Sequence, residues 1–128
     1  MQDFFFLKVE NFYFKLEFSD IFYIQAEKKY IVVATANSAY VSLVSISHIE
    51  KLLPKDLFCR VHRSYIISLE HLHKFDNQIA HVGCRKIPIA KQFKEALKEA
   101  ITIINGEVRC HKLDNGDVDK LLRVINPE

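Results

Sequence analysis

The segment FCRVHRSYIIS, residues 58–68, sets two arginines and a histidine among residues that favour β-strands. Cys59 and His62 are the residue types that could serve as a nucleophile and its general base. On an extended chain, residues three apart point to opposite faces, so this pair does not meet. The spacing argues against a thiol-dependent enzyme and leaves the positive charge of Arg60 and Arg63 to be explained.

A second group of residues has the chemistry of metal ligands. His71 and His73 share one face of a predicted strand, and Cys110 with His111 could complete a zinc site. The CxxC and HxxxH spacings that are typical of zinc sites are absent from the sequence. Strand histidines otherwise serve as surface groups or hydrogen-bonded core groups, and the three glycines form no phosphate-binding loop. We therefore expect no metal, no cofactor and no enzymatic activity.

Positive charge is concentrated in the middle of the chain. Residues 28–98 carry twelve Lys and Arg against five Asp and Glu, although the formal net charge of the whole chain is only +2. Because a polyanion releases its condensed counter-ions when lysine and arginine neutralise it, such a concentration favours phosphate binding. The alternative is an ordinary solvated surface around which the same charge is spread evenly.

The composition is that of one soluble globular domain. Hydrophobic residues make up 49% of the 128 residues and charged residues 27%, which suffices for one core without disulfides. The longest apolar runs fall far short of the roughly 20 residues that cross a bilayer, so no membrane span is expected. The three cysteines are widely spaced, and the first residues lack the pattern of a secretion signal. We therefore expect a cytoplasmic protein with reduced thiols.

The elements that position these charges are mostly short strands. Alternating residues predict a hairpin of residues 3–9 and 12–18 with its turn at Glu10 and Asn11. The inward face predicted for its second strand consists of Phe12, Phe14, Leu16 and Phe18. The remaining predicted strands, which have the spacing of an all-β meander with one turn at Gly83, are residues 21–26, 30–35, 39–43, 58–61, 64–75, 78–82 and 85–89.

A short helix is predicted in the middle of the chain, over residues 45–53. Ser47 and Glu50 have the spacing of a capping box, and Pro54 ends the segment. The residues that share its apolar face are Ile46, Ile49, Leu52 and Leu53.

The strongest helical pattern lies nearer the C-terminus. Apolar residues at helical spacing predict an amphipathic helix over residues 90–104, which Asn105 and Gly106 end. In the tail that follows, we predict a strand in residues 107–113 and a weak amphipathic helix in residues 118–125.

Three motifs of the chain resemble those of LytTR-type DNA-binding domains. FCRVHRSYIIS resembles the central signature of the family, in which Phe-x-Arg-x-His-Arg-Ser-Tyr precedes two branched apolar residues. IFYIQAEKKY, residues 21–30, resembles an earlier family segment, and KIPIAKQF, residues 86–93, resembles a later one. The resemblance implies a mainly β fold of small antiparallel sheets in an elongated arrangement, with short helices. We predict a DNA-binding domain in residues 1–104 and a C-terminal extension of unknown role in residues 105–128.

The resemblance also implies sequence-specific binding of double-stranded DNA by the output domain of a bacterial transcription regulator. Because such a β-rich domain has no recognition helix, loop side chains would enter the grooves while basic flanks hold the backbone. The DNA-binding residues that the three motifs supply are Lys28, Lys29 and Tyr30, then Arg63 and Ser64, and finally Lys91, Gln92 and Lys94. Lys91 and Lys94 are DNA-binding candidates for a further reason, since they open the predicted helix, and a helix N-terminus offers free N–H groups to a phosphate.

The partners implied are repeated promoter sites, a receiver domain or upstream sensor kinase, and a second copy of the domain on DNA. The output fold already occupies these 128 residues, so we expect any phosphorylation switch to lie elsewhere. The competing functional hypothesis is a β-rich interaction or sensory module whose basic band binds an anionic partner.

Each candidate residue also has a structural interpretation. Lys28 and Lys29 fit a solvated hairpin turn, and Tyr30 fits a core ring. Arg60 fits an ion-pair partner, and His62, at the head of a strand, fits a structural role better than base reading. These interpretations stay open on sequence alone.

The sequence departs from the family pattern at four positions. Gln25 stands where the family has Glu, Ser68 where it has Asn, and Ala90 where it has Ser or Gly. Lys91 replaces the usual Arg, which keeps the charge but loses the bidentate fork that reads guanine. We therefore expect weaker guanine recognition at Lys91.

Overall fold

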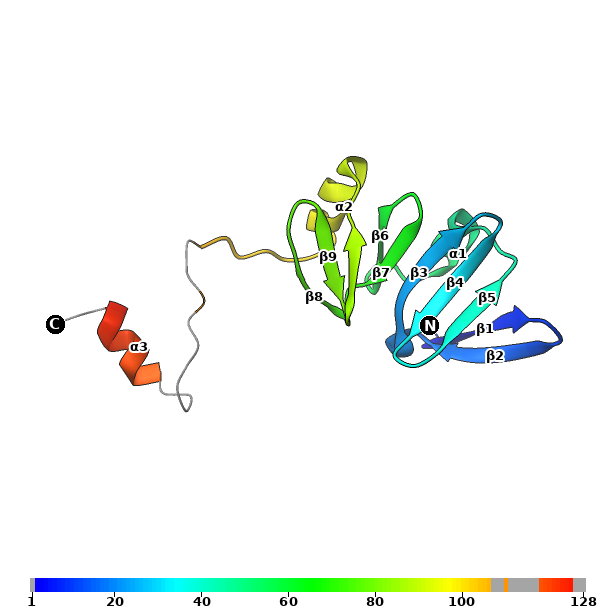
Figure 1. The fold of residues 1–128 in the computed structure, drawn as a ribbon, viewed down its shortest axis with the longest axis horizontal. Coiled ribbons are helices and arrows are strands. Elements are labelled where there is room, and N and C mark those ends of the chain that lie inside the picture. The colour runs from blue at the N-terminus through cyan, green and yellow to red at the C-terminus, as the bar shows by residue number, and fades with distance from the viewer. Residues whose placement is uncertain (1, 107–109, 111–117, 126–128) are drawn as a thin grey trace.

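The computed structural model describes residues 2–106, 110 and 118–125. Within these residues, ten strands form three antiparallel sheets of two, five and three strands, joined by short helices (Figure 1). This architecture confirms the predicted mainly β fold. None of the helices described there combines the length and the apolar character that a membrane crossing requires. The strand predicted in residues 107–113 falls outside the described residues, apart from Cys110.

The chain opens with the predicted hairpin of β1 (Phe4–Val9) and β2 (Phe12–Glu17). Its turn contains Glu10, whose φ of 58° lies in the left-handed region. The prediction of a fully inward apolar face on β2 was wrong, because Phe12 and Phe14 are 65% and 38% exposed. The tip of the hairpin projects beyond the five-stranded sheet (Figure 1), so only the part of β2 near Leu16 reaches the core.

The five-stranded sheet is the centre of the fold and has the strand order β5-β4-β3-β7-β6. A short 3₁₀ turn, η1 (Phe18–Asp20), leads from the hairpin into it. The bounds of its strands are β3 (Ile21–Glu27), β4 (Tyr30–Thr35), β5 (Ala39–Ser42), β6 (Phe58–His62) and β7 (Tyr65–Ser68). The meander therefore holds through β5, after which β7 inserts beside β3 and leaves β6 at the edge.

This sheet is covered on both faces by separate hydrophobic cores. One core joins it to the hairpin and to helix α1 (Ile46–Leu52) and includes Ile24 and Ile66. The other core joins it to the three-stranded sheet and to helix α2 (Lys94–Glu99) and includes Val61 and Ile67. Because adjacent strand residues point to opposite faces, Ile66 and Ile67 enter different cores. The continuous apolar run in β7 is typical of a strand buried on both faces.

The start of α1 differs from the predicted capping box. Ser45 is the N-cap residue, and its Oγ accepts a hydrogen bond from the backbone N–H of His48 at 3.1 Å. Ser47 and Glu50 instead bond to Arg60, 13 and 10 residues further along the chain. Ser47 and Glu50, whose spacing suggests a local cap, thus bind a distant arginine instead.

The three-stranded sheet has the order β10-β9-β8, with β8 (Leu72–Phe75), β9 (Ile79–Val82) and β10 (Arg85–Pro88). The single strand predicted over residues 64–75 is broken between β7 and β8, where the Ser68 hydroxyl accepts a hydrogen bond from the His71 N–H. The break lets β8 leave the central sheet. The predicted turn at Gly83 is confirmed, with a φ of 59°.

The helix predicted over residues 90–104 is present but shorter. A 3₁₀ turn, η2 (Lys91–Phe93), precedes α2, which ends at Glu99. Leu97 is 1% exposed and anchors the helix, whereas Ile104 is 94% exposed. Since Ile103 and Ile104 are exposed, further turns would gain little from tertiary packing. The helix predicted in the tail is confirmed as α3 (Val118–Ile125).

Replacing Gly83 by Ala should destabilise the fold by about 2–4 kcal/mol, the sum of a left-handed backbone and an overpacked contact. An added Cβ would lie 2.5 Å from the Phe22 ring. Gly106→Ala is the matched control, because a Cβ there meets nothing within 4 Å. Urea unfolding of both variants measures the difference, and equal stability of the two would contradict the packing described at Gly83.

Candidate nucleic-acid interface

The three segments that carry the predicted DNA-binding residues lie at one edge of the molecule. The β3–β4 and β6–β7 turns are neighbours because the Ala26 N–H donates to the Ser64 carbonyl at 2.8 Å. The segment after β10 joins them through a hydrogen bond of 2.8 Å from the Ala90 N–H to the Val61 carbonyl. We call this surface the loop edge; it consists of residues 28–30, 63–64 and 91–94.

The first segment of the loop edge is a tight hairpin turn. Lys28 and Lys29 form the turn between β3 and β4, and Lys28 has a φ of 58°. Both lysines are exposed, in agreement with a solvated turn. Tyr30 is 41% exposed, so the core-ring interpretation of this residue was wrong. Its ring centroid lies 5.8 Å from Lys29 Nζ, which gives the turn a cation next to an aromatic face.

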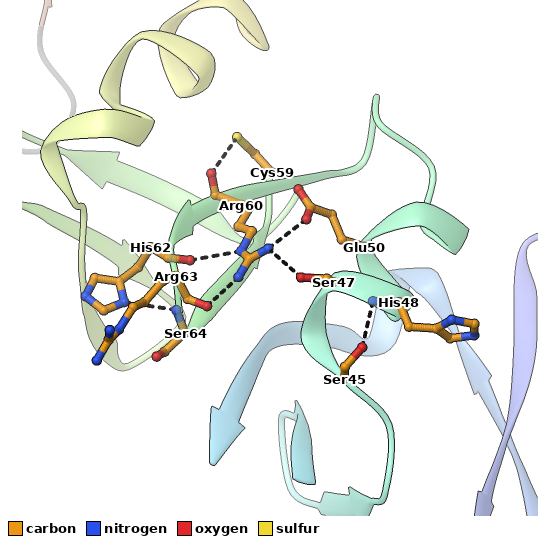
Figure 2. A network of polar contacts seen from close by, with 9 residues as sticks. All are labelled: Ser45, Ser47, His48, Glu50, Cys59, Arg60, His62, Arg63 and Ser64. Atoms are coloured by element: carbon orange, nitrogen blue, oxygen red, sulfur yellow. Dashed lines mark hydrogen bonds and ion pairs between the residues drawn. The ribbon is translucent and has the colours of Figure 1, made fainter. Parts of the chain in front are cut away.

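The second segment, at the β6–β7 turn, is held by the Arg60 side chain (Figure 2). Arg60 donates to Glu50 Oε1 at 2.9 Å and to Ser47 Oγ at 3.3 Å on α1. Its other nitrogens donate to the carbonyls of His62, at 3.2 Å, and Arg63. The planar guanidinium can serve four acceptors at once, which a lysine cannot. The ion-pair interpretation of Arg60 is therefore confirmed.

His62 completes this turn as an acceptor. Its Nδ1 lies 3.0 Å from the Ser64 N–H, and its ring meets Tyr65 edge-on at 5.7 Å between centroids. These contacts agree with the structural interpretation of His62. The neighbouring side chain, that of Arg63, is exposed and makes none of the described ion pairs or side-chain hydrogen bonds. The turn is thus rigid in its backbone while its outermost cation is available to a partner.

The third segment begins at the end of β10. Lys91 and Gln92 are exposed, and Lys94 is half-buried at the first position of α2. Phe93 lies between them, with its ring centroid 5.9 Å from Arg60 Cζ. Arg60 therefore contacts both the second and the third segments, which fixes their relative position. Its contact with Phe93 is not indicated by the sequence, because 33 positions separate the two residues.

The arrangement around Cys59 does not support nucleophilic catalysis. Cys59 is buried, its Sγ lies 3.6 Å from the Arg60 carbonyl, and His62 Nδ1 already accepts from Ser64. Burial, and secondly the Glu50 carboxylate, raise the pKa of the Cys59 thiol. A nucleophilic cysteine needs the opposite shift, toward the thiolate.

The prediction that His71 and His73 share one face of a strand was wrong. His71 precedes β8, stacks on Phe22 with 4.1 Å between ring centroids, and has its Nε2 2.6 Å from the Ser19 carbonyl. His73 lies in β8 beside His81. The described part of the chain contains no group of three or more metal-ligating side chains.

Comparisons with known proteins point to one family of DNA-binding domains. The family model of the LytTr DNA-binding domain matches residues 11–102. The sensory transduction protein LytT of Bacillus anthracis is 28% identical over 104 residues, which are 76% of this chain and 42% of the relative. The heme-containing CO-sensing transcriptional regulator RcoM 1 of Paraburkholderia xenovorans is 28% identical over 96 residues, 70% of this chain and 36% of the relative. The chain thus spans less than half the length of either relative.

A solved LytTr DNA-binding domain from Bacillus cereus has the same fold. Its TM-score is 0.67 at 22% sequence identity, and the match covers 78% of this chain and 97% of the solved one.

Arg60→Ala should lower the free energy of unfolding by about 1.5–3 kcal/mol, since it leaves Glu50 and two turn carbonyls without their charged donor. Arg60→Lys should recover part of this loss, because a lysine keeps the charge but not the fork. Lys55→Ala, at an exposed cation, is the control and should change stability by less than about 0.5 kcal/mol. Urea unfolding separates the three variants. An Arg60→Ala protein as stable as the control would show that this network does not support the turn.

Proposed function

Because the chain belongs to the LytTR DNA-binding domain family, whose model matches residues 11–102, we propose that it binds double-stranded DNA sequence-specifically through the loop edge. The single observation that carries this proposal is that three cation-bearing loops meet at one end of the strands of the central sheet. Their cations, Lys28, Lys29, Arg63 and Lys91, are all exposed. Neighbouring loops that present cations in this way match a duplex, which offers phosphates beside its groove edges.

The residues of the loop edge divide into base-reading and backbone-holding groups. Arg63 has the fork that pairs with a guanine edge, and its turn is fixed by Arg60. Lys91 is the second base-reading residue, with a single charged nitrogen in place of a fork. Lys94 is half-buried and one turn further back, which suits a phosphate. Lys28, Lys29, Tyr30, Ser64 and Gln92 complete the proposed DNA contacts.

In the cell, we assign the domain to the output part of a cytoplasmic bacterial transcription regulator. The relatives named above are a sensory transduction protein and a transcriptional regulator, each more than twice as long as the region matched. The proposed partners are therefore repeated promoter sites, a receiver domain or an upstream sensor kinase, and a second copy on DNA. The competing proposal, an interaction module for an anionic protein, uses the same basic edge and differs in its response to nucleic acid.

The proposal predicts that affinity for DNA falls steeply as the salt concentration rises. It also predicts that variants of base-reading residues and of phosphate-binding residues lose affinity in different ways. With about five phosphate contacts, log K should fall against log salt with a slope of roughly −4 to −5. Arg63→Ala and Lys91→Ala should each cost about 1–3 kcal/mol on a preferred duplex and relax the preference at particular base pairs. Lys94→Ala should weaken binding to preferred and scrambled duplexes alike and reduce the slope by about one.

Binding curves for the three variants on one preferred and one scrambled duplex, over a series of salt concentrations, measure these effects. Lys55→Ala, at an exposed cation outside the three segments, is the control, and Arg60→Ala should lower stability more than base preference. Equal losses on both duplexes for Arg63→Ala and Lys91→Ala would reject base reading by these residues. A flat salt response without any preferred genomic fragment would favour the anionic-protein module.

We further propose that residues 1–104 are sufficient for DNA recognition and that residues 105–128 are a separate extension. The family match ends at residue 102, and all the proposed contacts precede it. Truncation after Ile104 should leave the ratio of affinities for preferred and scrambled duplexes unchanged. Stability or self-association should change, because α3 has an apolar side that includes Val118 and Leu122, each about half exposed. Loss of base preference in a truncated protein that still melts cooperatively would assign DNA reading to the tail.

A further inference from the structure

The three-stranded sheet carries a row of basic side chains across its outer face. Lys74 on β8 and Lys86 on β10 both pair directly with His81 on the middle strand, β9. Residues paired in this way project from the same face, with Cβ atoms about 4.5–5.5 Å apart. The neighbouring β9 residues Ala80 and Val82 are fully buried on the opposite face, so these three side chains point away from the core. We call Lys74, His81 and Lys86 the basic row.

The basic row is electrostatically unfavourable in the isolated domain. Like charges directly opposite one another destabilise a sheet, and neither lysine forms an ion pair among the described residues. The pKa of His81 is lowered by its loss of hydration and then by Lys74, His73 and Lys86, with Asp76 acting in the opposite sense. A sheet that keeps these basic groups together, with Asp76 as the one carboxylate acting on His81 and with both lysines outside the described ion pairs, is suited to an external anion.

The position of the basic row relates it to the loop edge. The Ile89 N–H donates to the Gln78 carbonyl at 2.7 Å, and the next residue, Ala90, bonds to Val61. The β8–β9 turn therefore lies at the same end of the structure as the loop edge. Lys86 is three residues before Ile89, which corresponds to about 10 Å along a strand. Lys91, the nearest loop-edge residue along the chain, is five positions from Lys86, so a duplex that extends past the loop edge by about five base pairs, at about 3.4 Å each, spans the distance to the row.

We propose that the basic row is a second DNA site, which binds phosphates flanking the base pairs read at the loop edge. This inference rests on the proposed function and extends it to a surface outside the three family motifs. The flexible stems of Lys74 and Lys86 allow their ammonium groups to follow the backbone. Because phosphates are the same at every base pair, the row contributes affinity and orientation but no base preference.

His81 makes this second contact sensitive to pH. A phosphate beside the ring favours the protonated imidazole, so DNA binding should raise the pKa of His81 from its lowered value in the free domain. DNA binding then takes up a proton, and affinity should increase as the pH falls from about 8 to about 6, around the ordinary imidazole pKa. In the free domain the effect of pH on folding has the opposite sign, because the lowered pKa of His81 makes the fold less stable as the pH falls below the ordinary imidazole pKa.

The test compares two double variants that remove equal charge. Lys74→Gln/Lys86→Gln alters the basic row, and Lys8→Gln/Lys15→Gln alters two exposed lysines of the β1–β2 hairpin, at the far end of the domain from β8 and β9 (Figure 1). We expect the row variant to bind preferred and scrambled duplexes with a salt slope less steep by about two, at about 0.9 per phosphate contact. The hairpin variant should keep the wild-type slope, and both should keep the wild-type ratio of affinities.

The outcomes separate the two proposals. If the wild type binds its preferred duplex and the row variant matches the hairpin variant, the second site is wrong and the loop edge stands. That result is also the one expected if the row serves an acidic protein. If the wild type prefers no duplex, the proposed function fails first. A loss confined to the preferred duplex would overturn phosphate binding by the row.

His81→Gln provides the second measurement. The variant should bind DNA with a weaker dependence on pH between 6 and 8 than the wild type, and thermal melts establish that it is folded. An unchanged pH dependence would remove His81 from the site, because the effect of pH would then arise elsewhere in the protein.

Discussion

The burial of the central sheet on both faces is the constraint on which the rest of the fold depends. Ile66 and Ile67 follow each other in β7 and enter different cores, so neither face is free for a polar site. Side chains of its middle strands can therefore meet water or a charged partner chiefly at the strand ends. The turns at one end are joined by backbone hydrogen bonds between distant segments, and their cations gather there. The double burial thus places the exposed cations of the central sheet in the turns at its strand ends.

Two arginines of one short motif have opposite roles in this arrangement. The Arg60 side chain is 16% exposed, and its hydrogen bonds are made within the protein, to α1 and to the next turn. Arg63 is exposed on the turn that Arg60 holds. A guanidinium is suited to both tasks, because it stays charged when partly buried and also forks toward an external acceptor. The cationic character of the motif FCRVHRS is therefore partly structural.

Local pattern predicted the strands and their turns, since alternation and turn residues act over a few positions. The same pattern predicted that the helix containing α2 continues to Ile104, because the apolar spacing continues there. Only a buried residue such as Leu97 stabilises a helix through packing. The spacing of Ser47 and Glu50 suggested a local helix cap. The bond that Ser47 actually makes, to Arg60, spans 13 positions and leaves no local pattern in the sequence. The family resemblance identified the three loops. Their meeting at the loop edge depends on the registers between distant strands, and so does the alignment of the basic row. No single segment of the sequence encodes these registers.

The environment of Cys59 has a consequence for the redox behaviour of the domain. Cys59 lies in β6 next to Arg60, and burial together with Glu50 favours its protonated thiol. Peroxides and alkylating reagents attack the thiolate, so they react slowly at this position. Cys84 is exposed, and it lies in the β9–β10 turn at the opposite end of the sheet from the loop edge. Oxidants and thiol-directed labels should therefore react at Cys84, and at Cys110 in the C-terminal extension, before they react at Cys59.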